Sequence, residues 1–179
     1  MKRNNQGFSY VELILVIAIM AIVIGIITLS MGLVSRSNVN RGADKLENTL
    51  NQARTASMAK GYRNGALTIL CQDGKYYYYV GDYNATDDIE ENKTEFANTT
   101  ISVGYTKVGD EDSLISIGDG GRLIITYNQS TGAFNTSPTV GAYIDSIVLS
   151  KDDKRCVIKL YPETGKCTIN PEVIEEESE

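Results

Sequence analysis

The sequence predicts an α+β protein in which one long N-terminal α-helix packs on a head of antiparallel β-strands. An apolar run without a charged side chain extends from Leu13 to Val34. An amphipathic pattern of helical period follows it, and no proline interrupts residues 8–60. From Ala66 onward, short segments rich in β-branched and aromatic residues alternate with turns rich in Gly, Asp, Asn and Pro.

The apolar run is long enough to cross a lipid bilayer. Its 22 residues would form a helix of about 33 Å, slightly more than the ~30 Å hydrocarbon core of a typical membrane. A secretory signal peptide would be shorter, and no Ala-x-Ala-like cleavage site follows the run. We therefore expect residues 8–34 to form the transmembrane half of the helix. Basic residues flank both ends of the run, so charge alone does not settle its orientation.

Residues 35–60 predict the amphipathic half of the same helix. Apolar and small residues recur there at spacings of three and four, while the charged residues lie off that face. A coiled coil is less favoured, because fewer than four heptads are present. Gly61 is a suitable residue to end the helix. The expected buried face consists of Val39, Ala43, Leu46, Leu50, Ala53 and Ser57.

Residues 61–170 predict a β-rich globular head, and residues 171–179 an acidic tail. Asp73-Gly74, between two strand-like segments, is a strong signal for a hairpin turn. The polar and acidic stretch 82–98 is typical of a long surface loop. The expected strands are residues 66–71, 75–80, 100–108, 114–117, 122–127, 143–149, 156–161 and 166–169.

Charge is divided unevenly along the chain. Residues 1–60 contain seven Lys or Arg and three Asp or Glu, a net charge of +4, whereas residues 61–179 contain ten and twenty, a net charge of −10. A basic stem suits a surface of anionic lipid headgroups. An acidic head argues against direct binding of nucleic acid, which calls for a basic patch.

The composition also restricts the chemistry that the head can perform. The chain has no histidine and no C-x-x-C pair, so catalytic triads with histidine and the usual zinc sites are excluded. We expect no enzymatic activity and no cofactor. The acidic residues Asp110-Glu111-Asp112 and Asp119 could bind calcium in a head loop. Since they lack the ligand spacing of an EF-hand, solvated turns are the favoured interpretation.

Three cysteines, Cys71, Cys156 and Cys167, fall in expected strands. If the last two strands form a hairpin, Cys167 lies opposite Leu160 and four residues from Cys156, or roughly 13 Å. That distance excludes a disulfide between Cys156 and Cys167. A disulfide between Cys71 and either of them stays open. The alternative is that all three are reduced and pack as small apolar residues.

A run of four tyrosines, residues 76–79, lies on an expected strand. Alternate side chains point to opposite faces of a strand, so Tyr76 and Tyr78 share one face, and Tyr77 and Tyr79 the other. We expect one pair to pack on the helix. The other pair has two interpretations, further packing or an exposed contact for a partner.

The residues ahead of the apolar run form a motif of their own. Residues 7–13 read Gly-Phe-Ser-Tyr-Val-Glu-Leu, which puts the carboxylate of Glu12 at the edge of a membrane-length helix. An ionised carboxylate in a membrane span is costly unless it has a partner. Glu12 is therefore a candidate functional residue. The motif resembles the class III leader of type IV pilins and type II secretion pseudopilins. The resemblance covers residues 1 to about 35, and it requires glycine, aromatic residue, glutamate and apolar span in that order.

This resemblance implies a maturation pathway. A membrane-embedded prepilin peptidase would cut between Gly7 and Phe8 on the cytoplasmic face and remove residues 1–7 as a cytoplasmic leader peptide. Phe8 would become the N-terminal residue and be N-methylated. The mature chain would be a single-pass protein of the cytoplasmic membrane with an extracytoplasmic head, and after assembly it would be part of a fibre at the cell surface.

The resemblance also implies a role for Glu12 in assembly. Its carboxylate would neutralise the N-terminal amine of Phe8 on a neighbouring subunit, deep among packed apolar helices. Two buried charges are tolerated when they are paired, whereas one left alone costs several kcal/mol. Glu12 would thereby set the register of the subunits. The implied partners are the prepilin peptidase, other pilin or pseudopilin subunits, the inner-membrane assembly platform and the lipid bilayer.

A second resemblance is looser and concerns the head. Residues 122–133 and the closing hairpin 161–166 are similar to minor pseudopilins of the H type, which favours a minor subunit. The sequence thus predicts a structural subunit of a type IV pilus or pseudopilus, with the pilin fold. The alternative is a singly anchored extracellular domain that binds a ligand or the cell wall and does not polymerise. Such a domain would keep residues 1–7 and would not depend on Glu12.

Overall fold

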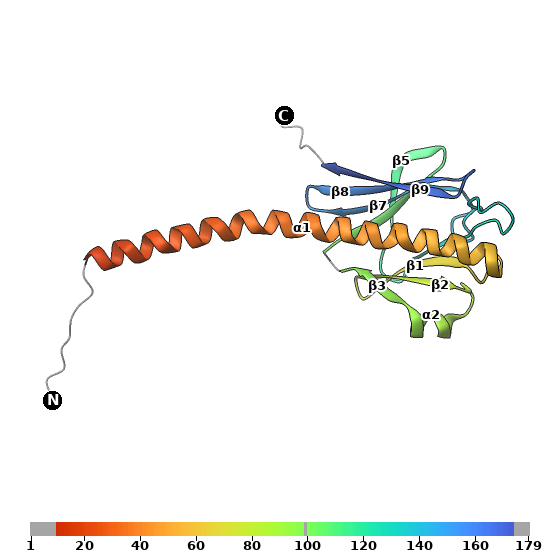
Figure 1. The fold of residues 1–179 in the computed structure, drawn as a ribbon, viewed down its shortest axis with the longest axis horizontal. Helices are drawn as coiled ribbons and strands as arrows, with labels where there is room; N and C mark the ends of the chain where they lie inside the picture. The colour runs from red at the N-terminus through yellow and green to blue at the C-terminus, as the bar shows by residue number, and fades with distance from the viewer. Residues whose placement is uncertain (1–9, 99, 174–179) are drawn as a thin grey trace. The chain divides into compact units, whose positions relative to one another are not determined.

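A long helix and two antiparallel sheets make up the computed structural model (Figure 1). The structure describes the backbone of residues 10–98 and 100–173, and the side chains of these residues except 23–37 and 171–173. It divides into two compact units, residues 1–36 and residues 37–179. The expected N-terminal helix is present as α1 (Tyr10–Lys60), which contributes residues to both units. The α+β class with antiparallel strands is confirmed.

In the unit of residues 37–179, α1 buries the face that the sequence predicts. The exposed fraction is at most 1% for all six of its members, Val39, Ala43, Leu46, Leu50, Ala53 and Ser57. The helix ends where Gly61 adopts a φ of 91°, a left-handed conformation that glycine reaches without steric cost. The amide of Gly61 donates to the carbonyl oxygen of Ser57 over 2.9 Å and completes the last turn.

The first sheet has the strand order β3-β2-β1-β6. The hairpin at Asp73-Gly74 is confirmed, and both turn residues have positive φ, 52° and 71°, as a two-residue type I′ turn requires. The strands of this sheet are β1 (Ala66–Gln72), β2 (Lys75–Gly81), β3 (Thr94–Ala97) and β6 (Arg122–Ile125).

The second sheet has the strand order β5-β4-β7-β8-β9. In its last hairpin Leu160 lies opposite Cys167, which is the register expected from the turn at residues 162–165. The antiparallel strands of the head therefore form two sheets and not one. Its strands are β4 (Ser102–Lys107), β5 (Asp110–Ser116), β7 (Ile144–Lys151), β8 (Lys154–Tyr161) and β9 (Lys166–Val173).

One hydrophobic core joins both sheets to the helix. Figure 1 shows residues 37–60 of α1 running along the two sheets, with β7, β8 and β9 to one side and β1, β2 and β3 to the other. At Gly42 a Cβ would lie 3.0 Å from the side chain of Leu149 in β7 and 3.4 Å from the carbonyl oxygen of Phe96 in β3. The absence of a side chain at residue 42 thus lets the helix approach both sheets closely.

Three expectations about the head need correction. Residues 82–98 are not a loop, because they contain the helix α2 (Thr86–Asn92), which buries Ile89, and the strand β3. The strand expected from residue 114 begins earlier, since β5 starts at Asp110. Finally, β9 continues to Val173, three residues into the segment expected as an acidic tail, and residues 174–179 lie outside the described part.

Candidate functional site

The carboxylate of Glu12 lies in the first turn of α1, and its side chain is exposed. A negative charge in this position is favourable, because the first amides of a helix carry partial positive charge. Gly7 and Phe8, the residues of the expected cleavage and methylation site, lie outside the described residues, so their roles stay predictions.

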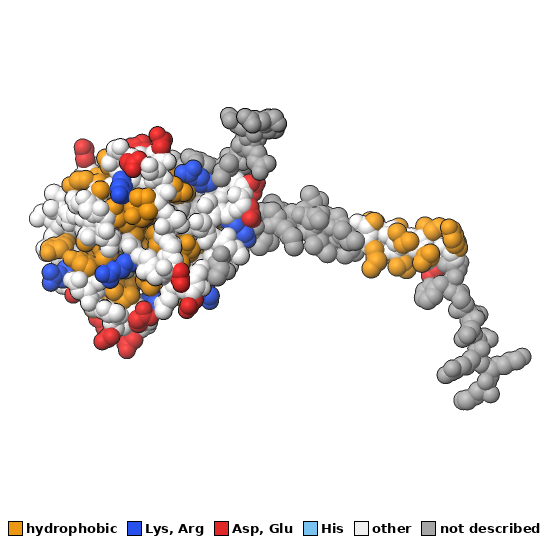
Figure 2. Space-filling model, turned by 180° about the vertical axis from the view of Figure 1, so that it is seen from behind, with side chains coloured by type: hydrophobic (Ala, Val, Ile, Leu, Met, Phe, Trp, Pro, Cys, Tyr) orange, Lys and Arg blue, Asp and Glu red, His pale blue; other side chains and the backbone are white. Residues whose placement is uncertain are grey.

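Around Glu12, the described side chains of residues 10–22 form an apolar helical segment that is exposed on every side. Large hydrophobic residues are distributed round the whole helix, and Figure 2 shows their orange side chains along the face of the segment that is in view. A helix that is apolar all round is stable when another apolar phase covers it, either a protein core or a membrane. The exposed hydrophobic residues of the segment are Tyr10, Val11, Leu13, Ile14, Leu15, Val16, Ile17, Ile19, Met20 and Ile22.

Within the part of the chain that the structure describes, no helix offers a long enough apolar stretch to span a membrane. The side chains of residues 23–37, which include the second half of the expected span, lie outside that part.

The three cysteines lie in different strands. Cys71 is in β1, Cys156 in β8 and Cys167 in β9. Cys71 and Cys167 are free thiols, so neither of the two disulfides with Cys71 is formed in this structure. Burial raises the pKa of the Cys71 thiol, and it raises that of Cys167 to about 11. Both thiols are therefore protonated at neutral pH and have little nucleophilic character.

The acidic residues considered for calcium are separated by the fold. Asp110, Glu111 and Asp112 are exposed at the start of β5. Asp119 lies beside the β1–β2 hairpin, where its Oδ1 accepts a hydrogen bond from the amide of Gly74 over 3.4 Å. Among the described residues, no group of three His, Cys, Asp or Glu side chains is arranged to hold a metal ion.

The tyrosine run on β2 divides between the two faces as expected. Tyr76 and Tyr78 lie in or against the core, where both contact the ring of Phe96. On the opposite face the ammonium group of Lys93 lies 5.1 Å from the centre of the Tyr77 ring. Tyr77 is thus partly covered by a residue of this chain.

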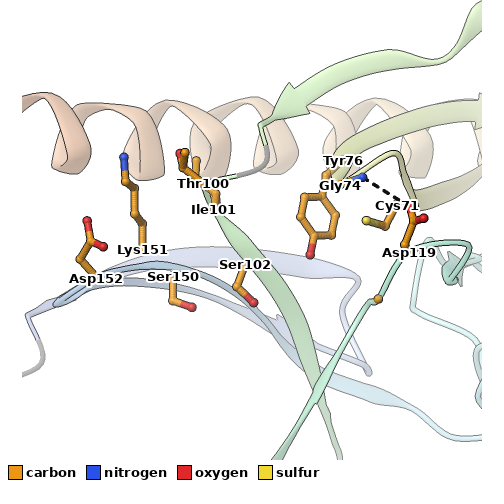
Figure 3. A pocket seen from close by; sticks show the side chains of 11 residues that line it. Cys71, Gly74, Tyr76, Thr100, Ile101, Ser102, Asp119, Ser150, Lys151 and Asp152 are labelled. Carbon is orange, nitrogen blue, oxygen red and sulfur yellow. Dashed lines mark hydrogen bonds between the residues drawn. The ribbon is translucent and has the colours of Figure 1, made fainter.

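A hollow of 420 Å³ lies between the β1–β2 hairpin and the end of β7 (Figure 3). Cys71, Tyr76 and Asp119 gather at one end of it, and Lys151 stands at the other end. Burial raises the pKa of both the Cys71 thiol and the Tyr76 hydroxyl. These lining residues include no activated nucleophile beside a base, so the hollow offers no evident catalytic arrangement.

A second hollow, of 770 Å³, lies at the end of the second sheet where β7 begins and β8 ends. Its lining includes an ion pair, in which the Lys159 ammonium donates to both carboxylate oxygens of Asp145 over 2.6 and 2.8 Å. Hydrogen bonding to Asp145 raises the pKa of Lys159. Sequence reasoning missed this site because its residues come from segments far apart in the chain. The exposed aromatic residues Tyr143 and Tyr161, at two turns, were its only local signal.

Comparison with known proteins identifies the N-terminal segment. A family model of the prokaryotic N-terminal methylation motif matches residues 2–28. The matched range includes Gly7, Phe8 and Glu12. No curated protein and no solved structure gives a significant match to the chain.

Proposed function

We propose that this chain, which has the prepilin-type N-terminal methylation motif of type IV pilins and pseudopilins at residues 2–28, is a structural subunit of a pilus-like fibre. The observation that supports the proposal most strongly is a coincidence of two features. The matched motif runs into a helix whose described residues 10–22 are apolar and exposed all round, with the single acid Glu12 in its first turn.

The N-terminal segment first acts as a membrane anchor in this proposal. Residues 8–34 cross the cytoplasmic membrane once, with the N-terminus inside and the head outside. The prepilin peptidase cuts after Gly7, and Phe8 becomes the methylated N-terminus. Exposed apolar side chains on residues 10–22 support this step, because lipid removes them from water at a gain of about 25 cal/mol per Å².

In the assembled fibre, neighbouring helices replace the lipid around this segment. The carboxylate of Glu12 then pairs with the N-terminal amine of Phe8 on an adjacent subunit. Since an unpaired buried charge costs several kcal/mol, only a register that brings the two groups together is stable. The assembly platform in the membrane and other pilin or pseudopilin subunits are the partners of this step.

The head serves as the part of the subunit that covers the fibre or its tip. A long helix whose inner face is buried against antiparallel sheets is compatible with the pilin fold. The looser resemblance of residues 122–133 and 161–166 to H-type pseudopilins supports a minor subunit. The role is structural, not catalytic, and it requires no cofactor.

Processing tests this proposal directly. The full chain would be expressed with and without a co-expressed prepilin peptidase, extracted from membranes, and analysed by intact mass and N-terminal sequencing. We expect a chain that begins at methylated Phe8 only when the peptidase is present. A Gly7→Val variant is the matched control and should keep its leader in both cases.

An uncut chain that begins at Met1 despite an active peptidase would contradict the proposal. It would instead support the singly anchored binding domain, which keeps residues 1–7 and never enters a fibre.

A further inference from the structure

Exposed hydrophobic side chains of the head gather at the 770 Å³ hollow beside β7 and β8. Its volume lies within the range of about 300–1,000 Å³ that is typical of ligand pockets. Of the large hydrophobic residues exposed on the described part of the head, three line this hollow, Val108, Tyr143 and Tyr161. Phe134 and Leu160, both buried, form its apolar floor. Such a gathering is typical of a contact surface.

The charged residues that line the hollow are mostly acidic. Glu111, Asp145 and Glu163 face it together with a single cation, Lys159. That cation is already engaged, because its ammonium lies 2.6 Å from Asp145 and 4.0 Å from the carboxylate of Glu111. The side chains of Glu111 and Glu163 are exposed. The lining therefore has a net charge of −2 and two carboxylates that can accept hydrogen bonds from a ligand.

We propose that this hollow binds an arginine side chain presented by a partner protein. A guanidinium group is planar, so it can stack on the exposed ring of Tyr143 or Tyr161 while it donates to the carboxylate of Glu111 or Glu163. The apolar floor suits the methylene stem of the same side chain. An anionic ligand would meet repulsion from the net negative lining. A purely apolar ligand would take water away from the exposed carboxylates of Glu111 and Glu163 without offering them a hydrogen-bond donor.

The partner is a basic protein and not a second copy of the head. Residues 61–179 have a net charge of −10, so two heads repel each other, whereas a basic partner is attracted over a distance. This site is independent of the proposed function, since its geometry lies wholly within residues 108–164 and does not involve the N-terminal helix.

The test is a titration of the isotope-labelled full chain, in a neutral detergent, with the peptide acetyl-Gly-Arg-Gly-amide, followed by NMR. We expect shifts that are concentrated at residues 108–111, 143–145 and 159–163. The peptides acetyl-Gly-Gln-Gly-amide and acetyl-Gly-Glu-Gly-amide should leave these signals unchanged. Glu111→Gln should weaken binding of the arginine peptide about fivefold, as should Tyr143→Ala.

The matched control is Glu91→Gln, which removes the same charge from an exposed position on α2. It should leave the affinity unchanged. Equal losses in Glu91→Gln and Glu111→Gln would mean that only the overall charge attracts the peptide, and would overturn the proposal. An absence of localised shifts would do the same. Concentration-dependent changes at these signals without any peptide would assign the hollow to a second copy of the chain and overturn the choice of partner.

Discussion

Two parts of α1 have similar helical backbones but opposite distributions of apolar side chains. Over residues 10–22 every described side chain is exposed, although most are hydrophobic. Over residues 39–57 one face is buried to 1% exposure or less, and the opposite face carries polar and charged groups. Helix propensity does not explain the difference, because it describes how readily a residue enters a helix and not which side chains of that helix are buried. The second part has its apolar partner within the head, whereas the described side chains of the first part have none among the residues that the structure describes.

The largest effect expected from this difference concerns two leucines of the same helix. Leu50→Ala should destabilise the head by about 2–5 kcal/mol, because it leaves a cavity at a fully buried position. Leu15→Ala, at a side chain that is 59% exposed, should change head stability by less than about 0.5 kcal/mol. Urea unfolding of the full chain in a neutral detergent, followed by circular dichroism, measures both. Equal losses of stability in Leu50→Ala and Leu15→Ala would contradict the difference between the two parts of α1.

A smaller effect is expected from two lysines. Lys159→Met removes the partner of the buried Asp145 carboxylate and should destabilise the head by about 2 kcal/mol. Lys45→Met, at an exposed position of α1, should be close to neutral. The same unfolding measurement compares them. A loss in Lys45→Met as large as in Lys159→Met would mean that lysine contributes through the net charge alone.

The pH dependence of this ion pair has a definite sign. Asp145 raises the pKa of Lys159 above its ordinary value of 10.5, so the folded state holds the proton more tightly than the unfolded state. The contribution of the pair is complete below pH 10.5 and is lost as the pH rises through the higher folded-state pKa. As the pH rises from neutral, the difference in stability between wild type and Lys159→Met should therefore stay constant and narrow only above that value. A difference that narrows between pH 6 and 8 would contradict this assignment.

The smallest effect is expected from two tyrosines. The hydroxyl of Tyr127, which is fully buried, donates to the carbonyl oxygen of Leu50 over 2.8 Å. Tyr127→Phe should cost about 1 kcal/mol, because one hydrogen bond between the helix and the segment after β6 is lost. Tyr10→Phe, at a side chain that is 79% exposed, should cost nothing measurable. If Tyr127→Phe were also neutral, the hydroxyl would not help to hold the helix.

The helix α1 could be predicted from the sequence because the signals for it are local. The spacing of Val39, Leu46 and Leu50 follows the helical period, and Gly61 marks the end of the helix. The hairpin at Asp73-Gly74 was equally clear, since only a few residue types suit two successive positive φ angles. In both cases residues that are close together in the sequence are sufficient to predict the element.

Other elements lack such local signals. The helix α2 is short and buries only Ile89, so no apolar period indicates it. The strand β5 begins with Asp110, Glu111 and Asp112, which have low β-propensity and are tolerated because β5 is an edge strand. The separation into two sheets depends on the pairing of β1 with β6, which are about 50 residues apart in the chain.

The two candidate sites, Glu12 and the hollow around Lys159, also differ in whether neighbouring residues in the sequence indicate them. Glu12 could be predicted because a single acid interrupts an apolar pattern within one continuous segment. The hollow around Lys159 could not, because Val108, Tyr143 and Tyr161 come together only after β4, β7 and β8 have paired.

The role proposed for Glu12 in assembly is tested by the fraction of the chain found in sheared fibres, for wild type and for Glu12→Gln, in a cell that has the matching peptidase and assembly platform. We predict that Glu12→Gln is processed and keeps a stable head, but that its fibre content falls about tenfold or more, because the amine of Phe8 is left unpaired. Asp44→Asn, which removes a charge from an exposed position on the same helix, should assemble normally. Wild-type fibre content in Glu12→Gln would contradict the pairing of Glu12 with the amine of Phe8.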